Sequence, residues 1–397
     1  MISKKVKEIA PSLTLEITAK AKKMKAEGIS IIGFGAGEPD FNTPEYINNA
    51  AKKAIDIGFT KYTPASGTAE LKKAICDKFY LDNGLTYKPE QIVISSGAKS
   101  SLYHAISALV DDGDEVILPS PYWLTYPELI KLAGGKVVLV KAEGQNGYKV
   151  TAEQIKNVIT PKTKCLILNS PNNPTGAVYS KQEIEEIAKV VEEAGIYVIS
   201  DEIYEKLVYG GEIHYSIAQV NDYMKEHTVI INGMSKTYAM TGWRIGYLAC
   251  PTQIAKAISS MQSHTTSNAC SISQYASTVA LADEEGKVFI EKMQKIFDER
   301  RQFMVEKLKA IDGIVCIEPK GAFYVFVDVS GLYGKKYNGE EINGSLSFAD
   351  KALKAGVALI PGIAFGDDNC IRLSYAISKE DISEGIDRLE KFIKELM

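Results

Sequence analysis

The chain has 397 residues, 45% of them hydrophobic and 24% charged, which is typical of a globular protein with one large and one smaller domain. Its 50 acidic and 46 basic residues leave a net charge of −4, and without a basic stripe this composition gives no support to nucleic-acid binding. Apolar runs stay well short of the roughly 20 residues that a membrane span needs, and the Lys-rich start lacks the apolar core of a signal peptide.

The first two thirds of the chain show the pattern of an α/β protein. Residues 14–28 have helical spacing and end at a glycine, and residues 29–38 form a strand that leads into a turn. Short apolar strands then alternate with amphipathic helices, which predicts a mostly parallel sheet covered by helices on both faces. The strands are expected at residues 91–97, 114–121, 136–142, 164–171, 196–202, 228–233 and 244–250.

The last third has a different pattern. A long charged helix is expected over residues 287–311, followed by strands within 315–319, 323–329 and 370–376. We therefore predict three parts, which are a large domain over 46–286, a smaller α+β domain over 287–397, and an N-terminal segment over 1–45 that packs with the smaller domain. Residues 330–347 are interpreted as an exposed insertion without chemistry.

Two common kinds of site are rejected. The run GFGAGEPD has Gly33 and Gly35 of a dinucleotide fingerprint, but Glu38 stands at its third glycine and the following proline prevents the required helix. The four histidines lack the spacing of metal ligands. The six cysteines are scattered without a CxxC pair, which predicts buried free thiols in a reducing cytoplasm. They are residues 76, 165, 250, 270, 316 and 370.

Polar clusters follow the apolar strands, and in parallel sheets ligands bind at the carboxyl ends of strands. Lys236 follows the strand over 228–233, directly after Ser235, and Arg244 lies eight residues further on. A lysine amine with a lowered pKa can form a Schiff base with an aldehyde. An arginine and a hydroxyl together suit a phosphate. Pyridoxal 5′-phosphate carries both an aldehyde and a phosphate.

Other strand ends offer the remaining groups that this cofactor needs. Asp201 ends the strand over 196–202 and can keep the pyridine nitrogen protonated. Tyr204 and Asn173 can reach the phenolic oxygen of the ring. Each of these residues alone has an ordinary structural explanation, such as a helix cap or an exposed turn.

The phosphate and the ring also have candidate partners. The turn of Gly97, Ala98 and Lys99 offers backbone N–H groups at the start of a helix, where anions bind readily. Trp123 could stack on the pyridine ring, although an isolated tryptophan is more often a core residue. The set as a whole indicates a pyridoxal-phosphate site.

The sequence resembles the class I/II aminotransferases of the pyridoxal-phosphate fold type I superfamily, and within it the bacterial-type aspartate aminotransferases. The resemblance extends over nearly the whole chain. The ordered series of motifs is more specific for the superfamily than for the substrate. The matching motifs are AGEPDF (36–41), TKYTPASG (60–67), SPYWLTYPE (120–128), NSPNNPTGAVY (169–179), SDEIYE (200–205), SKTYAMTGWRIGY (235–247) and RLSYA (372–376).

The resemblance implies the catalytic and cofactor roles. Lys236 would be the Schiff-base lysine and the proton carrier, Asp201 would pair with the pyridinium, and Tyr204 would act with it as a catalytic residue. Tyr62 would reach the phosphate from a partner subunit, so the family implies a homodimer with shared active sites.

The resemblance also implies how the substrate is held. Arg372 would bind the α-carboxylate, which Gly37 would approach through its backbone, with Trp123 and Asn173 beside it. Lys99 would bind a distal carboxylate, helped by two hydroxyls of the N-terminal segment. Those hydroxyls belong to Ser12 and Thr14.

The expected reaction transfers an amino group between L-aspartate and 2-oxoglutarate, giving oxaloacetate and L-glutamate. Aromatic amino acids, alanine and other donors remain open, because a lysine is less geometrically selective than an arginine. Some relatives act on prephenate with a basic residue where this chain has Ala10, which argues against that substrate. A fold type I lyase and a non-catalytic relative are the alternatives from other classes.

Overall fold

The computed structural model describes residues 2–397 and is organised around a seven-stranded sheet. Its strand order is β2-β8-β7-β6-β5-β3-β4, and every strand except β8 has the same direction. The strands are β2 (Ile92–Ser95), β3 (Glu115–Ser120), β4 (Lys136–Lys141), β5 (Thr163–Asn169), β6 (Tyr197–Asp201), β7 (Thr228–Gly233) and β8 (Gly246–Ala249).

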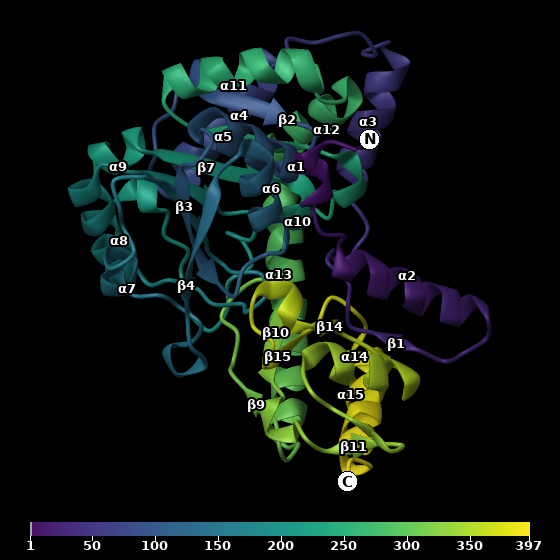
Figure 1. Ribbon diagram of the computed structural model, residues 1–397. Coiled ribbons are helices and arrows are strands. Elements are labelled where there is room, and N and C mark those ends of the chain that lie inside the picture. Colours follow the sequence, from purple (N-terminus) through teal and green to yellow (C-terminus); the bar gives the residue numbers. More distant parts are fainter. Residues whose placement is uncertain (1) are drawn as a thin grey trace.

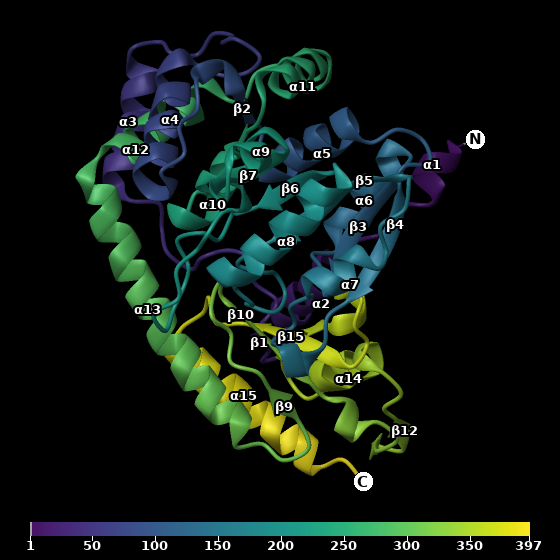
Figure 2. The same ribbon diagram turned by 90° about the vertical axis from the view of Figure 1, so that its left-hand side faces the viewer.

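Helices cover both faces of this sheet (Figures 1 and 2). Successive residues of β6 point to opposite faces and belong to different hydrophobic clusters. Ile199 packs with one cluster, on the face of α5, α6 and α11, and Val198 packs with another, on the face of α8. Burial on both faces is the reason why these strands are almost wholly apolar.

The helices of the chain begin and end at recognisable capping residues. Ser180 and Glu183 form a reciprocal capping box at the start of α8, and Gly84 ends α4 in a left-handed conformation. The helices are α1 (Lys4–Lys7), α2 (Leu13–Ala26), α3 (Glu45–Asp56), α4 (Ala69–Asn83), α5 (Ala98–Leu109), α6 (Thr125–Ala133), α7 (Ala152–Lys156), α8 (Lys181–Ala194), α9 (Asp222–Glu226), α10 (Met234–Thr237), α11 (Thr252–Thr265), α12 (Ser271–Ala282), α13 (Glu284–Lys309), α14 (Ser345–Lys354) and α15 (Lys379–Lys394).

A second, smaller sheet is formed by strands that follow α13 in the chain. Helix α13 is the long helix that runs along the side of the molecule in Figure 2. The second sheet has four strands in the order β14-β15-β10-β9, and a separate two-stranded pair joins β1 to β13. The N-terminal β1 is therefore paired with a strand near the end of the chain. These strands are β1 (Ile32–Gly33), β9 (Val315–Cys316), β10 (Tyr324–Asp328), β13 (Val357–Ala358), β14 (Ile360–Pro361) and β15 (Cys370–Ser374).

Three expectations from the sequence need correction. The strand expected to open at Arg244 begins at Gly246, because Arg244 has a left-handed backbone with φ of 57°. Residues 330–347 are only partly an exposed insertion, since β11 (Lys336–Tyr337) and β12 (Glu340–Glu341) are exposed but Leu332 and Ile342 are core residues. All six cysteines are free, but only Cys165, Cys250 and Cys370 are buried, and Cys270 is exposed.

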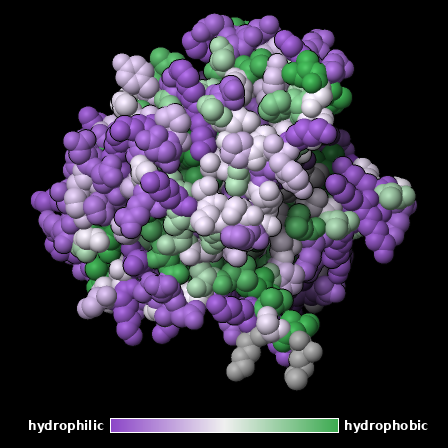
Figure 3. Space-filling model, turned by 90° about the horizontal axis from the view of Figure 1, so that it is seen from above, coloured by the Kyte–Doolittle hydropathy of each residue, from purple (hydrophilic) through white to green (hydrophobic). Residues whose placement is uncertain are grey.

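The surface carries no sign of a membrane span in the part of the chain that is described, where no helix is both long and apolar enough to cross a bilayer. Seen from above, hydrophilic residues surround the rim, with apolar and intermediate residues between them (Figure 3). Several exposed apolar side chains follow one another in α3 and the loop after it. They are Ile55, Ile57 and Tyr62, which are 56%, 59% and 92% exposed.

Candidate active site

A cavity of about 480 Å³ lies at the carboxyl edge of the large sheet, where β5, β6 and β7 end. Because β8 runs the opposite way, its beginning also reaches this edge, and it places Arg244 there. The cavity brings together most of the residues that the sequence predicted. These are Ser12, Thr14, Gly37, Ala98, Lys99, Trp123, Asn173, Asp201, Tyr204, Ser235, Lys236, Arg244 and Arg372.

Lys236 lies in the single turn of α10, directly after β7, and points into the cavity. Its Nζ donates a hydrogen bond of 2.5 Å to the carbonyl of Gly37. Burial lowers the pKa of this amine to about 8, with Arg244 and Arg372 adding to the effect, while Glu38 and Asp201 oppose it. A substantial fraction of the amine is therefore neutral, and nucleophilic, at mildly alkaline pH.

Asp201 is the last residue of β6 and is 3% exposed. Burial raises the pKa of its carboxyl to about 6, against hydrogen bonds from the Tyr126 hydroxyl at 2.7 Å and from the backbone of Ile203. One carboxylate oxygen of Asp201 is thus held in place by the hydroxyl of Tyr126. A cationic ring at the cavity would stabilise the charged form further.

Arg372 comes from β15 and is 2% exposed, with two aromatic rings close to its guanidinium. Its guanidinium carbon lies 4.3 Å from the centre of the Tyr324 ring and 4.9 Å from that of Phe365. Nη1 donates to the amide oxygen of Asn173 at 2.9 Å, and Nη2 donates to the carbonyl of Gly35. Across residues 2–397, Arg372 forms no ion pair and its buried Nε has no partner. A buried guanidinium in this state fits an anion as its missing partner.

Tyr204 and Asn173 lie at neighbouring strand ends and are both buried. The hydroxyl of Tyr204 is 3.1 Å from that of Tyr324, and the backbone N–H of Asn173 donates to Oδ1 of Asn169 at 2.9 Å. Asn173 precedes a cis proline. The Tyr204 hydroxyl and the Asn173 backbone thus have internal partners, while the Asn173 side chain accepts from Arg372 at the cavity.

The anion-binding corner is built by Arg244, Ser235 and the start of α5. Two glycines allow the close approach. A Cβ on Gly97 would lie 2.2 Å from Nη2 of Arg244, and one on Gly246 would lie 2.1 Å from the backbone nitrogen of Ala98. The first N–H groups of a helix lack intrahelical acceptors, so those of Ala98 and Lys99 are free to bind an anion.

The contacts of Gly97 and Gly37 show what each glycine does within the protein. The N–H of Gly97 donates to the carbonyl of Ser95 at 2.7 Å, so it is engaged within the protein, and Gly97 contributes the space that Arg244 needs. A Cβ on Gly37 would meet only the hydroxyl of Tyr324 at 3.7 Å, which is an ordinary contact, so sterics do not require glycine there.

The outer part of the cavity contains Lys99, Trp123 and the hydroxyls of the N-terminal segment. The Lys99 ammonium lies 4.9 Å from the centre of the Trp123 ring, and burial followed by repulsion from Arg244 lowers its pKa. Ser12 caps α2 by accepting from Leu15, whereas the buried Oγ1 of Thr14 has no partner among the described residues. Tyr62 lies outside this cavity and is almost fully exposed.

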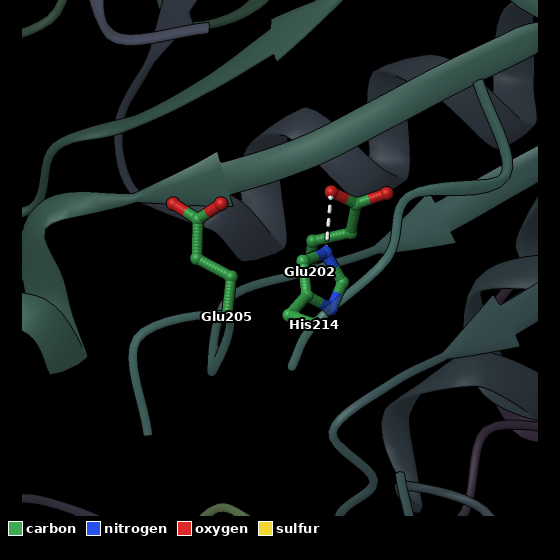
Figure 4. A group of neighbouring side chains, drawn as sticks. All are labelled: Glu202, Glu205 and His214. Carbon is green, nitrogen blue, oxygen red and sulfur yellow. Dashed lines mark hydrogen bonds and ion pairs between the residues drawn. The ribbon is translucent and has the colours of Figure 1, made fainter. Parts of the chain in front are cut away.

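An acidic cluster lies next to Asp201, and its chemistry argues for a structural role. Glu202, Glu205 and His214 have ligand atoms within 4.8 Å of one another, and Figure 4 shows the His214 ring bonded to Glu202. However, Glu205 forms a buried ion pair of 2.6 Å with Lys78, and Glu202 also accepts from two serine hydroxyls. These bonds satisfy both carboxylates and fasten the turn that carries Asp201 and Tyr204.

Three residues of the site were missed by the sequence analysis. Tyr126, Tyr324 and Asn169 line the cavity and orient Asp201, Tyr204 and Asn173 respectively. The two tyrosines lie in apolar runs and have the pattern of core residues. Asn169 ends β5, so the rule that selected polar residues at strand ends could have found it.

The residues present fit pyridoxal 5′-phosphate. The corner made by Arg244, Ser235 and the start of α5 offers a cradle that a Cβ on Gly97 would fill. A lysine with a lowered pKa and a buried carboxylate stand at the same cavity. A mostly parallel sheet with these groups at its carboxyl edge is the architecture of pyridoxal-phosphate fold type I.

Comparisons with known proteins agree with this class. The family model "Aminotransferase class I and II" matches residues 29–389. The chain is 49% identical to an aspartate aminotransferase of Bacillus sp. (strain YM-2), covering 99% of both chains, and 45% identical to a probable aspartate/prephenate aminotransferase of Aquifex aeolicus, covering 100% of this chain and 99% of that one. The crystal structure of the aspartate aminotransferase from Rhizobium meliloti superposes with a TM-score of 0.96 at 41% identity, covering 100% of each chain. The chain belongs to the class I and II aminotransferases.

Proposed function

We propose that this chain is a pyridoxal-phosphate-dependent aminotransferase that moves an amino group between L-aspartate and 2-oxoglutarate. The observation that carries the proposal is a set of three cations around Lys236. Arg244, Arg372 and Lys99 all line the cavity, and across residues 2–397 none of them forms an ion pair. A phosphate, an α-carboxylate and a distal carboxylate are three anions that such a set suits. The names of the relatives in Bacillus and Rhizobium support the same substrate.

The cofactor would be held by groups at three places. Arg244, the Ser235 hydroxyl and the first N–H groups of α5 would hold the phosphate, and the Asp201 carboxylate would accept a hydrogen bond from the protonated ring nitrogen. Tyr204 and Asn173 would face the ring hydroxyl. When bound, pyridoxal 5′-phosphate supplies an aldehyde that reacts with amines and a ring that withdraws electrons from the adjoining carbon.

The protein's own groups would orient the amino acid and move its proton. Arg372 would fix the α-carboxylate, and the nearby rings of Tyr324 and Phe365 pack against the guanidinium and restrict its movement. Lys236 would accept the proton from the substrate Cα and return it, as a base whose pKa of about 8 lies close to the working pH. Such proton transfer commonly contributes ~10²–10⁴-fold to a rate.

The substrate preference would depend on the outer part of the cavity. Lys99 would attract the distal carboxylate, and the unpartnered hydroxyl of Thr14 would donate to it beside Ser12. Aspartate and 2-oxoglutarate are both dicarboxylic acids, so the same groups would serve both halves of the reaction. Prephenate is expected to be a poor substrate because Ala10 brings no charge.

We also propose a homodimer. Tyr62 is 92% exposed and lies outside the cavity of its own chain, close in sequence to the exposed Ile55 and Ile57. Large apolar side chains that follow one another on a surface are typical of a protein interface. A partner subunit would cover them and receive Tyr62 at its phosphate corner.

The test is a single-turnover titration of purified protein loaded with pyridoxal 5′-phosphate. L-Aspartate, L-alanine, L-phenylalanine and L-methionine are added without an oxo acid, and the loss of the visible absorbance of the bound cofactor is followed. We expect aspartate to act at the lowest concentration, and Lys236→Ala to show neither turnover nor this absorbance change. Preference for an uncharged amino acid would overturn the substrate. Steady release of pyruvate or ammonia without an acceptor would instead favour a lyase.

A further inference from the structure

A short segment over residues 37–43, here called the strap, crosses the cavity beside Lys236. The strap is bonded to residues 236–244 at four points. The carbonyl of Gly37 accepts from Lys236, and the carboxylate of Glu38 accepts from the Thr241 hydroxyl at 2.7 Å. Thr43 donates to the carbonyl of Ala239 and accepts from the indole of Trp243.

One of these contacts leads directly to the anion-binding corner. Thr241 uses its hydroxyl to reach Glu38 and its carbonyl to accept from Nη1 of Arg244 at 2.9 Å. The geometry is therefore a relay from a carboxylate, through one threonine, to the arginine that faces the phosphate position. Arg244 has a left-handed backbone, and the Thr241 carbonyl is the protein acceptor that its guanidinium contacts among the described residues.

The contacts of Glu38 support a role in this relay. Its side chain is exposed, but across residues 2–397 it forms no ion pair, so the Thr241 hydroxyl is its partner. The neighbouring acid of the strap behaves differently, because Asp40 forms a bidentate ion pair with Arg300 of α13, at 2.8 and 2.9 Å. Asp40 fastens the strap, whereas Glu38 contacts the site.

We propose that Glu38 is a positioning residue that orients Arg244 toward the cofactor phosphate through Thr241. The role rests on the proposed function, since it presupposes a phosphate at this corner. Glu38 also interrupts the glycine pattern of a dinucleotide fingerprint, and it lies in the segment that follows β1. The strap thereby connects the substrate side of the cavity, at Gly37, with the phosphate side, at Arg244.

The test compares the affinity of cofactor-free protein for pyridoxal 5′-phosphate and for pyridoxal, which lacks the phosphate. Glu38→Ala and Thr241→Val each remove the hydrogen bond, and each is expected to lower the preference of the protein for pyridoxal 5′-phosphate over pyridoxal roughly fivefold. The ratio of the two affinities cancels the effect of the Glu38 charge on the pKa of Lys236, which both ligands share. The double variant is expected to be no weaker than either single one, because both changes break the same relay. Thr241→Ser, which keeps the hydroxyl, is expected to bind as the wild type does.

Two controls separate the relay from charge and from general loosening of the strap. Glu38→Gln keeps an acceptor but removes a negative charge, so it is expected to bind pyridoxal 5′-phosphate as tightly as the wild type or slightly more tightly. Asp40→Asn breaks the ion pair with Arg300 and is expected to change the affinity less than twofold.

Additive effects in the double variant, equal losses for both ligands, or an equal loss in Asp40→Asn would overturn the role of Glu38. These outcomes would leave the proposed function intact. A wild-type protein that binds neither ligand would overturn the proposed function and, with it, the role of Glu38.

Discussion

Replacing Lys99 by methionine is the most direct perturbation of substrate choice. Methionine keeps an unbranched stem that can pack on Trp123, whose ring centre lies 4.9 Å from the Lys99 ammonium, but it carries no charge. Lys99 stands in the first turn of α5 at the outer part of the cavity, away from Asp201 and Lys236 on their strand ends. The substitution therefore removes one cation and leaves the reacting groups in place.

The expected loss in the rate with aspartate can be worked out from the exposure of Lys99. Two unit charges ~4 Å apart attract by about 1 kcal/mol in water and by about 4 kcal/mol at an effective dielectric constant of 20. The Lys99 side chain is exposed yet partly desolvated, which places the interaction between these limits, at about 2 kcal/mol. This free energy corresponds to a loss of roughly 30-fold in the rate with aspartate at low concentration.

The assay is the single-turnover rate with L-aspartate and with L-alanine, measured without an oxo acid at low and high salt. Lys99→Met is expected to slow aspartate and leave alanine unchanged, and salt is expected to weaken the preference of the wild type for aspartate but not that of the variant. Lys136→Met, at an exposed lysine of β4, is the matched control. Equal losses with both amino acids, or no loss with aspartate, would refute the role of Lys99.

Three further predictions concern the inner part of the site. In cofactor-free protein, trinitrobenzenesulfonate labelling of Lys236, followed by peptide mass spectrometry, should rise with a midpoint near pH 8, because burial favours the neutral amine; a midpoint near 10.5 would contradict this. Asp201→Asn should keep the circular dichroism of the wild type, since Tyr126 can still donate to the amide oxygen, yet lose about 10³-fold in kcat; unchanged kinetics would exclude Asp201 from the mechanism. Arg372→Lys should lose roughly 100-fold in kcat/KM with aspartate and alanine alike, because a lysine lacks the planar fork; a loss confined to aspartate would move Arg372 to the distal carboxylate.

Much of the sheet could be predicted from the sequence because its strands are buried on both faces and are therefore continuously apolar. The same regularity placed Asp201, Asn173 and Lys236 at one edge, where the structure brings them together. The family and the pyridoxal-phosphate architecture are confirmed by the comparisons. The domain limits, the roles of the individual site residues and a cytoplasmic location stay predictions.

Other features depend on contacts between distant residues and were beyond a reading of local pattern. The ring of Tyr324 is indistinguishable from a core side chain until β10 and β15 are paired, which places it against Arg372. The left-handed backbone of Arg244 and the closeness of its guanidinium to Gly97 are not signalled by the local residue pattern. Cys270 is exposed because it lies just before α12, after the polar residues 265–268, which is a local signal that the prediction of buried thiols did not use.

The pairing of β1 with β13 has a consequence for the order in which the chain is made. Ile32 pairs with Val357, and the backbone of Phe34 bonds to Ala358 and Ser374, so the segment that leads into the strap has no partners until the ribosome has nearly finished. The large sheet, whose strands end at residue 249, is synthesised well before that point. Among the residues that line the cavity, Arg372 is therefore made last, well after Lys236 and its anion-binding corner. A chain that stops before residue 357 should therefore retain the large sheet but leave its N-terminal segment unplaced.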